Sequence, residues 1–178
     1  KNCTYCKSAF IFKSSYDLLG KTNKQIINYT KMYKSVKKED EDYLDSQIAL
    51  IALYLKRTLS GPAISISENL IKEFADSAEV YLWKVISIIK EKGFRKLNLP
   101  VARKLVDLLV VGKSLSEFPE DFIFVGTMLQ KQFFQKKSIV EPFALNEMLD
   151  IHDNEIEEIV RNFSEKDHRG SMYFEILS

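Results

Sequence analysis

The residue types best suited to chemistry are two cysteines near the start of the sequence. Cys3 and Cys6 are separated by two residues, a spacing at which a pair of thiolates binds zinc. A structural zinc site has four ligands, and the only histidines, His152 and His168, lie far along the chain. The pair therefore supplies half of a zinc site. The other ligands would come from upstream residues or from the two histidines; the alternative is a pair of ordinary thiols.

The residues that follow the cysteines resemble the first half of a C2H2 zinc finger. In that family the two cysteines precede a Phe and then an apolar residue, and here they precede Phe10 and Tyr16. Leu19 stands where the family has its first histidine. The resemblance is confined to residues 1–20, a lead-in to the rest of the chain. It implies zinc as a cofactor bound by Cys3 and Cys6, without a full ligand set in this chain.

An Arg and a His near the end of the sequence form a second chemical pattern. Arg161 is followed by a polar residue and, after a gap of six residues, by His168. This spacing resembles the Arg-x(4–6)-His signature of the all-α HEPN ribonucleases. The resemblance implies that His168 acts as general acid or base and that Arg161 stabilises the charged phosphorane. The alternative is a surface Arg and His beyond the last helix, beside Glu165 and Asp167, which would repel RNA phosphates.

Charge is distributed unevenly along a chain whose net charge is only +1. The segment from Lys84 to Lys113 holds eight basic residues and two acidic ones, whereas residues 141–168 hold nine acidic and two basic ones. A basic loop between helices can bind an acidic peptide, a phosphorylated segment or a nucleic-acid backbone. The alternative is a solvated face whose lysines favour a helix C-terminus. The predicted binding residues are Lys92, Phe94, Arg95, Lys96, Arg103 and Lys104.

These residues must be positioned by helices, because the chain is poor in turn formers and rich in helical patterns. It has 6 Gly and 4 Pro among 178 residues, too few for the many tight turns of a β-sandwich. Apolar residues from Leu44 to Leu59 recur at steps of three and four, which predicts a helix that ends at Gly61. Prolines at 100, 119 and 142 predict further helix starts, and Gly112 predicts the end of the helix that begins at Pro100. Capping boxes are predicted at Ser65–Glu68, Asp76–Glu79 and Asn154–Glu157.

The patterns together predict an all-α fold for residues 21–178 as one domain. We expect an irregular bundle or stack of about seven to eight antiparallel helices, of which a HEAT-like stack is one form. Trp83 is expected in the core. Phe122, Phe124, Phe133 and Phe134 fall in one helix, and the sequence leaves open whether all are buried or some line an exposed groove for a partner helix.

The function expected from the sequence is non-enzymatic protein interaction within a larger regulatory or scaffolding protein. No Gly-rich phosphate loop, nucleophile elbow or HExxH helix is present, so Arg161 and His168 are the only catalytic candidates. The alternatives are RNA binding by the basic surface and the HEPN-like ribonuclease. Two closely spaced cysteines and no apolar run of membrane-spanning length predict an intracellular, cytoplasmic or nuclear, protein.

Overall fold

The computed structural model describes residues 21–117, 119–140, 142–149, 173 and 175–177. Throughout these residues the regular structure is helical, with no strand, as predicted. From residue 21 to residue 149, the described part of the chain forms seven α-helices in succession, with short 3-10 segments (η2, η4) and a π-helical turn (η3) between some of them. Their bounds are α1 Asn23–Lys34, α2 Tyr43–Lys56, α3 Ser60–Glu73, α4 Ala78–Lys92, η2 Phe94–Lys96, α5 Leu99–Leu115, α6 Glu120–Leu129, η3 Gln130–Phe134, η4 Gln135–Lys137 and α7 Phe143–Met148.

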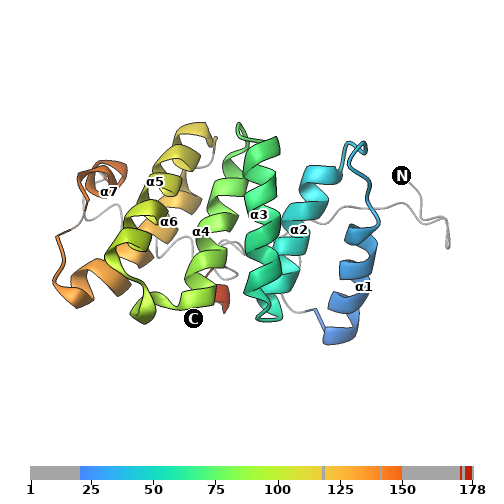
Figure 1. Ribbon diagram of the computed structural model, residues 1–178, viewed down its shortest axis with the longest axis horizontal. Helices are drawn as coiled ribbons and strands as arrows, with labels where there is room; N and C mark the ends of the chain where they lie inside the picture. Colours follow the sequence, from blue (N-terminus) through green and yellow to red (C-terminus); the bar gives the residue numbers. More distant parts are fainter. Residues whose placement is uncertain (1–20, 118, 141, 150–172, 174, 178) are drawn as a thin grey trace.

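The helices form a stack in which each one packs against its neighbour in the sequence. Figure 1 shows α1 to α5 side by side in chain order, each antiparallel to the one before it, with α6 behind α5. Beyond these sequential contacts, α2 also touches α4, α4 touches α6, and α5 touches α7. The even-numbered helices therefore form a layer of their own. None of the described helices has the length and hydropathy needed to cross a membrane.

The core of the stack is centred on α2 and α4, the two helices with neighbours on several sides. Every residue from Ile48 to Leu55 is buried, so α2 is covered on nearly its whole circumference. In α4, Trp83 is fully buried, as expected. Burying these side chains supplies most of the stability of the stack, because helical propensity alone does not hold helices of this length together.

A single helical turn that includes residues 173 and 175–177 packs against the even-numbered helices. The Tyr173 ring lies edge-on to Trp83 at a centroid distance of 5.9 Å, and its hydroxyl donates to Asp121 Oδ2 of α6 at 3.1 Å. Lys56 at the end of α2 lies 3.7 Å from Glu175. Tyr173, Ile176 and Leu177 are buried. The turn thus contacts three alternate helices of the stack.

The border between the second and third helices differs from the prediction. Gly61 was expected to end a helix, but α2 ends at Lys56 and Thr58 takes a positive φ of 58°. Gly61 and Pro62 lie instead in the first turn of α3, where a missing N–H costs no hydrogen bond. Ser65 is consequently inside α3, and no capping box forms there.

Two other predicted borders shift for different reasons. Ser77, not Asp76, is the N-cap residue of α4, and no side chain caps this end. Gly112 was expected to end a helix at its C-terminus, but α5 continues to Leu115. A Cβ at Gly112 would lie 2.2 Å from the Phe122 ring and 3.0 Å from Tyr81 Cβ. Gly112 therefore lets α4, α5 and α6 approach closely. The Asn154–Glu157 box lies outside the described residues.

Candidate binding surface

The six predicted binding residues lie along the connection from α4 to α5. Lys92 is the last residue of α4, and Gly93 then reverses the chain with a φ of 68°, a conformation that glycine adopts easily. Phe94, Arg95 and Lys96 form η2. The Asn98 side chain accepts a hydrogen bond from the Val101 N–H at 3.0 Å, which starts α5. Local sequence signals thus fix this connection.

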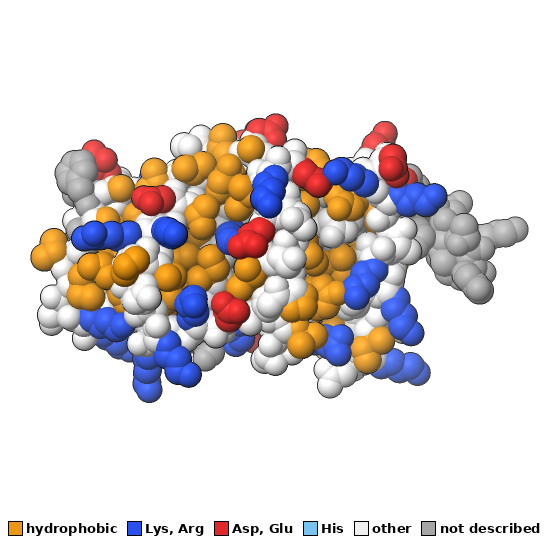
Figure 2. All heavy atoms as spheres, viewed as in Figure 1, with side chains coloured by type: hydrophobic (Ala, Val, Ile, Leu, Met, Phe, Trp, Pro, Cys, Tyr) orange, Lys and Arg blue, Asp and Glu red, His pale blue; other side chains and the backbone are white. Residues whose placement is uncertain are grey.

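The five cations of this connection point to solvent. Lys92, Arg95, Lys96, Arg103 and Lys104 are all exposed, and the structure shows no ion pair for any of them with another described residue. Arg103 and Lys104 are in the second turn of α5, within about 10 Å of its start at the usual helical rise. Figure 2 shows Lys and Arg side chains gathered along the lower left of the molecule, where α4 ends and α5 begins.

Phe94 differs from the cations around it. It is only partly buried and packs against the edge of the core. Because Phe94 packs against the core, it anchors the first residue of η2, while Arg95 and Lys96 remain exposed. We therefore assign Phe94 a supporting position, with its exposed edge available for contact.

Lys137 is a further cation at this surface that the sequence interpretation missed. Its ammonium donates to the Leu97 carbonyl at 2.7 Å and lies 4.4 Å from the centroid of the Phe133 ring. These two contacts hold η4 against the residue that follows η2. The pair is 40 positions apart in the sequence, so no local pattern could have revealed it. We call Lys92, Phe94, Arg95, Lys96, Arg103, Lys104 and Lys137 the basic edge.

The two lysines at the ends of the basic segment, Lys84 and Lys113, make contacts within the fold. The Lys84 side chain is only 10% exposed and forms an ion pair with Glu68 of α3. Lys113 donates to the Met148 carbonyl at the end of α7, at 2.7 Å. Lys84 is therefore paired within the fold, and Lys113 lies in the last turn of α5, at the opposite end of the helix from the basic edge. The surface that remains is smaller than the segment from Lys84 to Lys113, but its cations have no acidic partner among the described residues.

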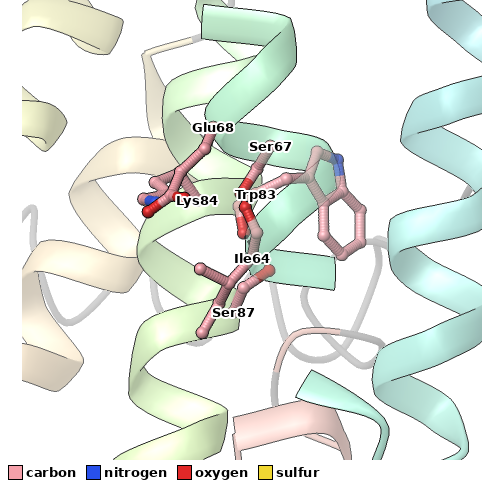
Figure 3. Close-up of polar contacts among 6 residues, drawn as sticks. All are labelled: Ile64, Ser67, Glu68, Trp83, Lys84 and Ser87. Carbon is pink, nitrogen blue, oxygen red and sulfur yellow. Dashed lines mark hydrogen bonds and ion pairs between the residues drawn. The ribbon is translucent and has the colours of Figure 1, made fainter. Parts of the chain in front are cut away.

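Lys84, Ser67 and Ser87 each have a hydrogen-bond partner at the contact between α3 and α4. Figure 3 shows Glu68 reaching Lys84, while Ser67 and Ser87 donate to the carbonyls of Ile64 and Trp83 at 2.8 and 2.7 Å. The hydrogen bond from Lys84 lowers the pKa of the Glu68 carboxyl, and the positive charge of Lys84 adds to the effect. This cluster joins two helices and has the composition of a structural contact.

The four phenylalanines that the sequence left undecided are all buried. Phe122 and Phe124 lie in α6, and Phe133 and Phe134 lie in the π-helical turn η3. Phe133 and Phe134 meet edge to face at 5.0 Å although they are adjacent in sequence. All four are 3% exposed or less. An exposed groove made of these rings is therefore absent.

The zinc and ribonuclease patterns fall on parts of the chain that the structure does not describe. Cys3, Cys6, Arg161 and His168 all lie outside the described residues. Within the described ranges, no group of three or more His, Cys, Asp or Glu side chains could hold a metal ion. The basic edge is thus the predicted site whose residues can be placed.

Comparison with known proteins adds no further assignment. No protein-family model, no curated protein and no solved structure matches this chain.

Proposed function

We propose that the domain is a non-enzymatic interaction module that binds an acidic or phosphorylated protein segment through the basic edge. The observation that supports this most is the separation of roles among the cations. Lys84 and Lys113 are engaged in contacts within the fold, whereas Lys92, Arg95, Lys96, Arg103 and Lys104 have no acidic partner among the described residues. Unpaired cations close together repel one another, so an anion that binds there relieves this repulsion.

The charges and side-chain types of the basic edge favour a short acidic segment over a long nucleic acid. Asp107, exposed one turn beyond Lys104, ends the run of positive charge along α5. The half-buried Phe94 is the single aromatic side chain of the basic edge, whereas single-stranded nucleic acid is typically held on several stacking rings. Arginine and lysine in one loop suit a few carboxylates or one phosphorylated side chain.

Fluorescence anisotropy with a labelled poly-glutamate peptide, a phosphoserine peptide and a single-stranded RNA tests this proposal. We expect both acidic peptides to bind the wild-type protein and Arg95→Glu plus Lys96→Glu to abolish binding. The matched control is Lys24→Glu plus Lys31→Glu, the same charge change on exposed positions of α1, and it should bind as the wild type does.

Two results would contradict the proposal. Equal loss in the α1 control would mean that only net charge matters. Tight RNA binding with a steep salt dependence, and weak peptide binding, would show instead that the basic edge serves nucleic acid.

A further inference from the structure

The exposed face of α5 carries apolar side chains where a solvated helix would be polar. Val111 and Leu115 are each 42% exposed, and Leu108 is half-buried. The opposite side of the same helix, with Ala102, Leu105, Val106 and Leu109, is fully packed into the core. Val111 and Leu115 therefore remain exposed, and Leu108 beside them is only partly covered by the core.

These residues form one strip that begins at the basic edge. Lys104, Leu108, Val111 and Leu115 follow one another at steps of four, three and four, which places them on a single face of the helix. Leu115 is 11 residue steps beyond Lys104, so the strip is about 16 Å long at the helical rise. In Figure 2, hydrophobic side chains lie at the upper end of α5, above the cluster of cations at its lower end.

The sequence of charges and apolar groups along α5 restricts what can cover the strip. A ligand that runs along it meets cations at the start of α5 and methyl groups at the end. Its complement is acidic at one end and apolar on one side of the other, which is the pattern of an amphipathic helix. A uniformly acidic ligand would gain nothing from Val111 and Leu115, and a uniformly apolar one would gain nothing from Lys104.

We propose that the partner binds as an amphipathic helix, with its acidic end on the basic edge and its apolar side on Leu108, Val111 and Leu115. This inference rests on the proposed function, because it names the second half of the same ligand. Steps of three and four on the strip match apolar side chains at the same spacing in the partner. A partner helix of about three turns covers the strip.

Two labelled synthetic peptides test the inference. The first has a run of Asp and Glu followed by leucines at steps of three and four, because acids in the first turn also stabilise the peptide helix. The second has alanine in place of each leucine, which keeps the charge and the helical propensity. Binding is measured by fluorescence anisotropy. We expect the leucine peptide to bind the wild-type protein about tenfold more tightly or better.

The variants assign that difference to the strip. In Val111→Gln plus Leu115→Gln, the leucine peptide should bind no more tightly than the alanine peptide. Ile27→Gln on α1 is the matched control, because Ile27 is also 42% exposed, and it should behave as the wild type does. Thermal unfolding midpoints close to that of the wild type show that all three proteins are folded.

The outcomes separate this inference from the proposed function. If both peptides bind equally well to the wild type, or the glutamine pair leaves the leucine advantage intact, the strip is not part of the interface and the inference is wrong. The basic edge then still stands as a site for acidic segments. If neither peptide binds, both the inference and the proposed function fail.

Discussion

At the scale of single residues, Lys84 shows how a charge inside a helical stack is tolerated. Its side chain is 10% exposed, whereas that of Glu68, its partner, is 57% exposed. The ammonium has therefore lost most of its hydration, while the carboxylate remains in contact with water. Removing Glu68 leaves a nearly buried charge without compensation, whereas removing the charge of Lys84 leaves an exposed acid that water solvates.

This asymmetry predicts different costs for the two halves of the pair. Glu68→Gln should lower the free energy of unfolding by about 1–2 kcal/mol. This is less than the usual cost of breaking a fully buried ion pair, because the Glu68 carboxylate is exposed. Lys84→Met should cost less than about 1 kcal/mol, because methionine fills a similar volume without a charge. Urea unfolding of both variants measures this. A larger loss in Lys84→Met than in Glu68→Gln would contradict this account.

The same pair predicts a dependence of stability on pH. The hydrogen bond and charge of Lys84 lower the pKa of Glu68 below its ordinary value of 4.5, so the folded state holds this proton less tightly than the unfolded chain does. The contribution of the pair is therefore fully present above pH 4.5 and is lost as the pH falls through the lowered pKa. The stability difference between wild type and Glu68→Gln should shrink over that range, as urea unfolding at several pH values would show. A difference that stays constant would argue against the linkage.

At the scale of helices, sequence patterns located the elements better than they located their ends. Prolines predicted the starts of α5, α6 and α7. Pro100 lies in the first turn of α5, and Pro119 and Pro142 are the N-cap residues of α6 and α7. At these positions the missing N–H costs no hydrogen bond within the helix. The helix ends predicted at Gly61 and Gly112 were wrong, because glycine ends some helices and allows close packing in others. Which role applies depends on what lies opposite, and that is a property of the tertiary structure.

The helix crossing at Gly112 yields a prediction of its own. Gly112→Ala would place a Cβ 2.2 Å from the Phe122 ring, which is fully buried and cannot easily turn aside. We expect a loss of about 1–3 kcal/mol in unfolding free energy, despite the higher helical propensity of alanine. Gly61→Ala is the control, because no atom lies within 4 Å of the added Cβ. Urea unfolding that shows no difference between the two variants would mean that the helices separate without cost.

At the scale of the whole molecule, the candidate surface was predictable only as far as it is local. The connection from Lys92 to Lys104 is continuous in sequence and has its own helix-ending glycine and helix-capping asparagine. The ion pair of Lys84 and the contact of Lys137 with Leu97 depend on elements that are distant in the sequence. Charge counts along the chain do not contain that information, so they extended the basic segment too far at both ends, to Lys84 and Lys113, and omitted Lys137.

A substitution at Tyr173 tests whether the stability of the stack depends on the contacts that this residue makes with α4 and α6. Tyr173→Phe keeps the ring against Trp83 but removes the hydroxyl that donates to Asp121, whose side chain is buried. We expect a loss of about 1–2 kcal/mol, because a buried carboxylate loses a donor. Tyr29→Phe on the partly exposed face of α1 is the control and should be neutral. Urea unfolding followed by circular dichroism measures both, and equal stability of the two variants would refute the role of this hydroxyl.

This turn also bears on how the stack comes apart. In a linear array of helices each unit contacts only its neighbours, so the ends can open while the middle stays folded. Here the Tyr173 hydroxyl contacts a residue 52 positions earlier, and its ring packs on Trp83 in the middle of the stack. The helices between them cannot open without releasing the turn. The stack should therefore unfold in a single cooperative transition, and fold more slowly than an array with sequential contacts alone.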